Sequence, residues 1–218
     1  MTTSDTQRSL QDQLDSITSN TRNLVQPERL AITDQSVQDL LATGIEDALL
    51  PVGSLAPAFA LEDTRKKIVR SEDLLALGPL VIKFFRGRWC PYCMTELEAW
   101  QLLQPQLRER GALMVAISPQ LVRQNDFTVQ RHGLSFPILT DPQANVAAAF
   151  GAAYTVPEGL RRHYRSILIN IPFINGDESW RLPLAATFII RRDGTISFAE
   201  AYADHRVRPE PSDILAAI

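Results

Sequence analysis

Two cysteines, Cys90 and Cys93, are the residues of this sequence whose type and spacing point most directly to chemistry, and the chain has no others. A free thiol has a pKa of ~8.5 and becomes a good nucleophile only after it loses its proton. At the start of a helix, the helix dipole and nearby cations lower the pKa of a Cys-x-x-Cys pair to between ~3.5 and ~7.5. The spacing also allows a disulfide within one helical turn. The pair is therefore expected to cycle between dithiol and disulfide.

The residues around the pair predict a junction between a strand and a helix. The apolar run at 80–85 contains β-branched and aromatic residues and predicts a buried strand. Pro91 suits the first position of a helix that extends to about residue 110, because the N–H that proline lacks has no partner there. Cys90 then becomes the N-cap and Cys93 the third helical residue, both close to free backbone N–H groups.

Three charged residues near the thiols are candidates for a supporting role. Arg86 and Arg88 precede the pair and add positive charge beside it. Glu96 lies three residues after Cys93 on the same face of the predicted helix. We expect Glu96 to pair with Arg86 or Arg88 and to orient that arginine.

Three other readings of the cysteine pair are weaker. A structural zinc site needs four ligands, and the three histidines, at positions 132, 163 and 205, are scattered singly. A structural disulfide is typical of secreted proteins, whereas residues 1–5 have no basic region that leads into an apolar segment. Two inert buried thiols fit poorly with a turn flanked by Arg, Trp and Tyr. We therefore expect no metal and no cofactor.

Length and charge limit the class of protein. The chain has 218 residues and a formal net charge of −3 at pH 7, which argues against binding to nucleic acid or to an anionic membrane. Its longest apolar stretches are about half of the roughly 20 residues that a membrane helix needs. The absence of a secretory signal makes the cytoplasm the expected location. One domain of ordinary size with an extension fits this length.

Residues 1–50 are expected to form an N-terminal helical extension, and residues 51–218 the main domain. Leu10, Leu14 and Ile17 recur at helical spacing, and so do Val37 and its apolar neighbours at 40 and 41, with Pro27 between the two sets. The pattern predicts two amphipathic helices. Their apolar stripes either pack on the main domain or form the contact of a homodimer.

The main domain alternates between predicted strands and helices, which indicates an α/β fold with a mixed central sheet flanked by helices. Residues 153–183 are rich in Pro, Gly and Asn and form the least regular portion. The other expected elements are strands at 59–62, 68–71, 113–117 and 136–139, helices at 126–132 and 144–150, and a hairpin of strands at 187–190 and 195–201.

Five motifs in order carry a resemblance to a known family. They are Gly53-Ser54-Leu55-Ala56-Pro57-Ala58-Phe59-Ala60-Leu61, the segment from Phe84-Phe85 to Trp89-Cys90-Pro91-Tyr92-Cys93, Cys93-Met94-Thr95-Glu96-Leu97, Phe136-Pro137-Ile138-Leu139-Thr140-Asp141, and Ala186-Thr187-Phe188-Ile189-Ile190 with Asp193-Gly194. Over residues 50–215 the chain resembles peroxiredoxins of the alkyl hydroperoxide reductase/thiol-specific antioxidant (AhpC/TSA) type, which belong to the thioredoxin superfamily. The resemblance implies a thioredoxin-like fold.

The resemblance places Cys93 at the peroxidatic position. Cys90 falls where a peroxiredoxin has Thr or Ser and where a thioredoxin has its attacking cysteine. Arg86 replaces the family's proline, and Ala185 stands where the family has an arginine and thioredoxins have a cis-proline. Arg86, Arg88 and Arg181 are the candidates to supply the missing guanidinium.

The resemblance implies a thiol-dependent peroxidase that reduces hydrogen peroxide or small organic hydroperoxides. Cys93 would become a sulfenic acid, Cys90 would resolve it as a disulfide, and a thioredoxin- or glutaredoxin-type dithiol would reduce that disulfide. Two alternatives stay open. One is a dithiol–disulfide oxidoreductase in which Cys90 attacks first, and the other is a non-catalytic redox sensor.

Overall fold

A central sheet of seven strands, in the order β2-β1-β5-β4-β3-β8-β9, organises the computed structural model, which describes residues 8–218. Strands β3, β4 and β5 are parallel to one another, and β1 and β8 join antiparallel on either side. This confirms the thioredoxin-like α/β fold with a mixed sheet. The strands are β1 (Ala60–Asp63), β2 (Ile68–Arg70), β3 (Leu80–Phe84), β4 (Leu113–Ser118), β5 (Ile138–Thr140), β8 (Thr187–Ile190) and β9 (Ile196–Glu200).

The side chains of strand β3 point alternately to the two faces of the sheet and so contribute to both sides of the core. Val81 and Phe85 pack in the cluster that also holds the cysteines, whereas Leu80, Ile82 and Phe84 pack in a second cluster on the opposite face. This alternation directs Lys83, a fully buried charged residue, to the same face as the cysteines.

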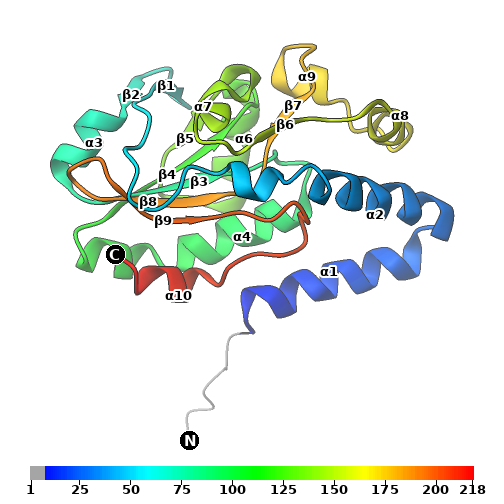
Figure 1. Ribbon diagram of the computed structural model, residues 1–218, viewed down its shortest axis with the longest axis horizontal. Coiled ribbons are helices and arrows are strands. Elements are labelled where there is room, and N and C mark those ends of the chain that lie inside the picture. The colour runs from blue at the N-terminus through cyan, green and yellow to red at the C-terminus, as the bar shows by residue number, and fades with distance from the viewer. Residues whose placement is uncertain (1–7) are drawn as a thin grey trace, which may run out of the picture.

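Helices cover both faces of the sheet (Figure 1). Side chains of α1 (Leu10–Leu24), α4 (Pro91–Leu102) and α10 (Pro211–Leu215) contribute to the core cluster on the cysteine side. Helices α3 (Ser71–Leu77) and α7 (Asn145–Ala149) pack on the other cluster. No helix within residues 8–218 is both long and apolar enough to cross a membrane.

The two expected N-terminal helices are confirmed as α1 and α2 (Pro27–Leu41). Leu10 and Leu14 of α1 are buried against the domain, where α1 packs on α4. Helix α2 packs on α8 (Glu158–Ser166), so both N-terminal helices pack on the main domain. This packing is the first of the two interpretations that the sequence left open. Residues 1–7, on which the expectation about a secretory signal rests, lie outside the described residues.

Several expected elements were wrong in extent. The helix expected from Pro91 to about residue 110 ends at Leu102 and resumes as α5 (Gln104–Glu109). Pro105 explains the break, because proline removes a helical hydrogen bond and clashes with the preceding turn. Helix α6 (Val122–His132) begins four residues earlier than expected.

The region expected to be least regular is in fact structured. Residues 153–183 contain α8, α9 (Ile171–Asn175) and a two-stranded sheet of β6 (Ala153–Thr155) and β7 (Arg181–Pro183). Elements this short are marginal in isolation and depend on tertiary packing, which sequence periodicity does not reveal. Helix α10 is also short and was not predicted from the sequence for the same reason.

Candidate active site

The loop after β3 places both thiols at the start of α4. Cys90 is the N-cap, Pro91 follows in the first turn, and Cys93 lies within that turn, as the sequence predicted. Gly87 makes the turn possible: its φ is +148°, and a Cβ at this position would lie 2.5 Å from Nε1 of Trp89. A side chain there would therefore displace the indole that packs beside the cysteines.

Arg208 supplies the positive charge closest to Cys93. Its Nη2 lies 3.9 Å from Cys93 Sγ, and its side chain is fully buried. The residue comes from the segment that follows β9 and returns across the start of α4 toward α10. A guanidinium at this distance in a buried setting stabilises the thiolate over the thiol.

The two thiols differ in acidity. Burial alone would raise the pKa of Cys93, but the hydrogen bond from the Cys90 thiol and the charges of Arg208 and Arg86 outweigh burial and lower it to about 6. Burial raises the pKa of Cys90 well above its usual value, and the neighbouring Cys93 sulfur reinforces this. At neutral pH the pair therefore holds its negative charge on Cys93 and its proton on Cys90.

Glu96 is the centre of a buried chain of charges. Its Oε2 accepts a hydrogen bond from Nε of Arg208 at 2.7 Å, and its Oε1 lies 2.5 Å from Nζ of Lys83. Lys83 also donates to the carbonyl oxygen of Ala185 and to Oγ1 of Thr187, each at 3.0 Å. The expectation that Glu96 pairs with Arg86 or Arg88 was wrong, because the partners come from β3 and from the segment after β9.

The buried charges of Lys83, Glu96 and Arg208 together favour an ionised Cys93. Lys83, Glu96 and Arg208 have buried side chains, and an uncompensated charge in such a place is strongly destabilising. Within this triad, two cations and one carboxylate leave one positive charge, which a thiolate at Cys93 neutralises. Arg86, which is also buried, adds a further positive charge beside the thiols. Burial lowers the pKa of Lys83, and the attraction of Glu96 opposes this effect.

Arg86 lies beside the other thiol, Cys90. Its Nη1 lies 4.0 Å from Cys90 Sγ, and its Nη2 donates a hydrogen bond to the hydroxyl group of Tyr164. The guanidinium also lies over the indole of Trp89, 4.7 Å from the ring centroid. Only 3% of Arg86 is exposed, so these contacts position it firmly beside Cys90.

The other expected arginines lie elsewhere. Arg88 donates from Nε to the side chain of Gln124, and Arg181 donates to the side chain of Asn145. The guanidinium beside Cys93 therefore belongs to Arg208, which the sequence reasoning missed. Arg208 lies 115 positions after Cys93, so no local pattern in the sequence could reveal it.

Lys83, which the sequence reasoning also missed, did leave a signal. A lysine inside an otherwise apolar strand requires a buried partner, and that requirement alone marks it for attention. No cis peptide bond occurs within the described residues.

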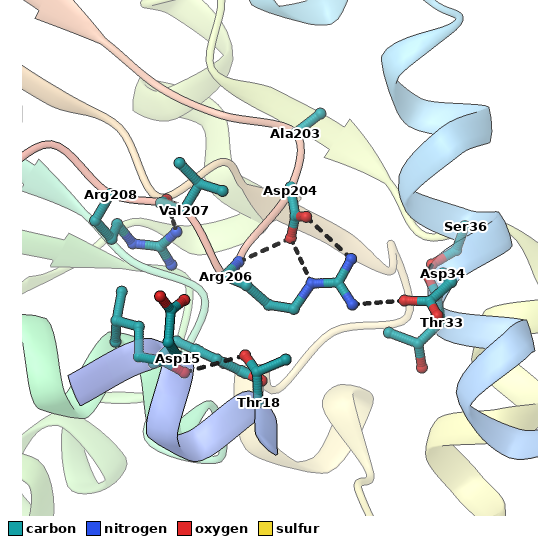
Figure 2. Close-up of polar contacts among 12 residues, drawn as sticks. Asp15, Thr18, Thr33, Asp34, Ser36, Ala203, Asp204, Arg206, Val207 and Arg208 are labelled. Atoms are coloured by element: carbon teal, nitrogen blue, oxygen red, sulfur yellow. Dashed lines mark hydrogen bonds and ion pairs between the residues drawn. The ribbon is translucent and has the colours of Figure 1, made fainter. Parts of the chain in front are cut away.

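A cavity of about 250 Å³ opens at the Cys90 end of the pair. Its walls come from α1, α2, α8 and the active-site turn, and they include Cys90 but not Cys93. Figure 2 shows how α2 is tied to the segment that carries Arg208: Arg206 bridges Asp204 and Asp34. The Nη1 atom of Arg206 lies 2.5 Å from Oδ1 of Asp34.

A dithiol above a buried charge chain, on a mixed sheet with Cys90 at a helix N-cap, defines a thiol-based redox centre of the thioredoxin superfamily. The AhpC/TSA family model matches residues 52–199, and the chain belongs to this family.

Similar proteins divide between two activities. The thiol-disulfide oxidoreductase ResA of Halalkalibacterium halodurans is 34% identical over 107 residues, which are 48% of this chain and 58% of the relative. Alkyl hydroperoxide reductase E of Mycobacterium tuberculosis is 24% identical over 174 residues, covering 78% of this chain and 99% of the relative. This chain thus spans about six-tenths of the length of the ResA relatives.

Solved structures agree on the fold. Peroxidoxin BcpB from Mycobacterium tuberculosis superimposes with a TM-score of 0.61 at 23% identity, covering 77% of this chain and 96% of that one. A mutant of PrxQ from Xylella fastidiosa gives a TM-score of 0.59 at 18% identity, covering 77% and 94%. At these identities the likeness shows the fold alone.

Proposed function

We propose that this protein is a thiol-dependent peroxidase that acts on hydrogen peroxide or small organic hydroperoxides. One observation carries the proposal: Cys93, at the family's peroxidatic position, has a pKa of about 6 and an arginine 3.9 Å from its sulfur. A thiolate that persists at neutral pH is the form that attacks a peroxide oxygen. The cation beside it stabilises the negative charge that develops on the leaving oxygen.

The reaction balances with the two thiols and an external dithiol. The Cys93 thiolate forms an S–O bond with one oxygen of the hydroperoxide as the O–O bond breaks, and the departing alkoxide takes a proton to become an alcohol. The sulfur of Cys90 then attacks the Cys93 sulfenic acid, forming the disulfide, while the hydroxyl group leaves as water with the Cys90 proton. A thioredoxin- or glutaredoxin-type dithiol reduces the disulfide and is itself oxidised.

Single-cysteine variants test this order of events. With one equivalent of peroxide, Cys93→Ser is expected to form no sulfenic acid, whereas Cys90→Ser consumes the peroxide once and gains one oxygen on Cys93, detected by mass spectrometry. Serine at position 90 keeps a hydroxyl group that can donate to the Cys93 thiolate, so this variant isolates resolution from attack. A sulfenic acid on Cys90 in the Cys93→Ser variant would contradict the proposal.

A second candidate, a dithiol–disulfide oxidoreductase, has a specific observation in its favour. Cys90, not Cys93, lines the cavity, and relatives named ResA are thiol-disulfide oxidoreductases. In this reaction Cys90 would attack a substrate disulfide and Cys93 would resolve the mixed disulfide. This candidate is supported if the Cys93→Ser variant, mixed with a disulfide substrate, accumulates a mixed disulfide through Cys90. The mixed disulfide should also form faster than the wild-type protein reacts with peroxide.

Three further expectations stay predictions: the domain boundary at residue 50, the cytoplasmic location and the homodimer. The same holds for the redox-sensor alternative.

A further inference from the structure

Lys83 lies in the middle of β3, where a positive charge is costly. Its side chain is 0% exposed, and its neighbours along the strand, Ile82 and Phe84, are apolar and fully buried. Burial lowers the pKa of Lys83, because the ammonium group loses its hydration there. A lysine in such a place releases its proton far more readily than one in water. Neither candidate reaction assigns a step to this group.

Three oxygen atoms surround Nζ of Lys83 and suit two protonation states. Oε1 of Glu96 lies 2.5 Å from Nζ, and the carbonyl oxygen of Ala185 and Oγ1 of Thr187 each lie 3.0 Å from it. An ammonium group donates three protons, and each of these oxygens can accept one. A neutral amine donates only two and presents a lone pair, to which the Thr187 hydroxyl group can donate. The same three neighbours therefore serve Lys83 with and without its additional proton.

The charges that act on Lys83 come from two elements. Glu96 and Cys93 belong to α4, and Arg208 belongs to the segment after β9. On the two neighbouring strands, β8 contributes an uncharged hydroxyl group, and the residue of β4 in register with Lys83 is Ala116. The carboxylate of Glu96 and the thiolate of Cys93 favour the ammonium form, whereas Arg208 opposes it. Loss of the thiolate charge therefore shifts Lys83 toward the neutral amine.

Formation of a disulfide removes the thiolate charge. In the reduced protein the two cations of this buried group, Lys83 and Arg208, are balanced by two anions. These anions are Glu96 and the Cys93 thiolate. With a disulfide and a charged Lys83, the group would hold one uncompensated positive charge, which is strongly destabilising in a buried place. Loss of one proton from Lys83 restores a net charge of zero, and Arg86 keeps the same charge in both states.

We infer that Lys83 releases a proton when the Cys90–Cys93 disulfide forms and binds one when that disulfide is reduced. In the reduction, an external dithiol gives up two electrons, becomes a disulfide and releases its two protons to the solvent. The S–S bond of the protein breaks, one proton binds Cys90 and a second binds Nζ of Lys83, while Cys93 stays a thiolate. The inference requires only this disulfide, which both candidate functions share.

The pH dependence of the midpoint potential of the disulfide counts these protons. Each proton bound with two electrons changes the equilibrium constant tenfold per pH unit, which corresponds to about 30 mV. The wild-type protein binds two protons, so its potential should rise by about 59 mV for each unit by which the pH falls. Lys83→Met binds only the proton of Cys90, and its slope should be about 30 mV per pH unit. Equilibration with dithiothreitol redox buffers measures both slopes.

Two controls make the slopes comparable. Each protein is measured over a range that begins about one pH unit above its own Cys93 pKa, because protonation of that thiolate would add a proton to the count. The rate of alkylation in the Cys90→Ser background gives this pKa. Lys67→Met, which alters an exposed lysine between β1 and β2, should keep the slope of about 59 mV per pH unit. Circular dichroism shows whether Lys83→Met is folded.

A second measurement needs no variant of Lys83. The chain has only three lysines, Lys66, Lys67 and Lys83, so labelling of lysine with ¹⁵N gives a simple spectrum of Nζ resonances. Formation of the disulfide should move the Nζ resonance of one lysine from the ammonium to the amine position and leave the two exposed lysines unchanged.

Several results would overturn the inference and leave the proposed function standing. They are a wild-type slope of about 30 mV per pH unit, a slope of about 59 mV that persists in Lys83→Met, and Nζ resonances that all stay in place on oxidation. If peroxide produces no disulfide between Cys90 and Cys93, the proposed reaction fails and the inference fails with it.

Discussion

Arg208 and Cys93 are 115 residues apart in the sequence, yet Nη2 of Arg208 lies 3.9 Å from Cys93 Sγ. The same guanidinium donates through Nε to Glu96, one turn further along the helix that begins at the cysteine pair. The residue thus links the thiolate to the buried charges of Glu96 and Lys83. Replacement of this arginine should raise the pKa of Cys93, because Arg208 is the charge that lowers it most, ahead of Arg86.

We expect Arg208→Gln to raise the pKa of Cys93 from about 6 toward the ~8.5 of a free thiol, because the charge that stabilises the thiolate is lost. The rate of alkylation by iodoacetamide, measured against pH in the Cys90→Ser background, reports this pKa. Arg110→Gln, which alters an exposed arginine at the end of α5, is the matched control. An unchanged pKa in Arg208→Gln would show that the other groups, Cys90 and Arg86, set the acidity.

The stability of the reduced protein should depend on the protonation of Cys93. Its folded-state pKa of about 6 lies below the unfolded value of ~8.5, so the contribution is complete above ~8.5 and disappears as the pH falls through about 6. The full contribution is on the order of 3 kcal/mol. Denaturant unfolding of the reduced wild-type and Cys93→Ser proteins across this window checks it. Two parallel stability curves would contradict the assigned pKa.

Glu96→Gln should destabilise the protein by about 3–5 kcal/mol, because it leaves the buried cations Lys83 and Arg208 without their shared carboxylate. Lys83→Met is the informative comparison, since it leaves the ion pair of Glu96 and Arg208 intact and should cost less. Urea unfolding of both variants at neutral pH measures the difference. Equal losses would mean that Glu96 does not balance two charges.

Asp34→Asn should loosen the N-terminal helices with little effect on the free energy of global unfolding. The ion pair of Asp34 with Arg206 is partly exposed, with side-chain exposures of 45% and 19%, and such pairs contribute about 1 kcal/mol or less. Hydrogen exchange in α2 should nevertheless accelerate, because this contact ties α2 to the segment that carries Arg208 (Figure 2).

The matched control is Asp39→Asn, on the same helix, whose carboxylate accepts a hydrogen bond from Gln35 four residues earlier. Exchange that accelerates equally in both variants would indicate a general effect of lost helix charge. Exchange that changes in neither would show that apolar packing alone holds α2 in place.

The local features of this protein followed from its sequence. The apolar run before the pair and Pro91 after Cys90 predict a strand, a turn and a helix N-terminus, and these depend on neighbours in the chain. The two N-terminal helices were predictable for the same reason, because apolar residues at helical spacing mark them. The five motifs identified the family, which the match over residues 52–199 confirms.

Only the tertiary structure decided which of the two thiols carries the negative charge and which residues surround that thiol. Electrostatic interactions act through space, so Arg208 and Lys83 reach the site from opposite parts of the chain. Glu96 was correctly singled out but given the wrong partners, since helical spacing describes neighbours along one helix and not across a sheet. The cavity between α1, α2 and α8 exists only because these helices fold back over Cys90.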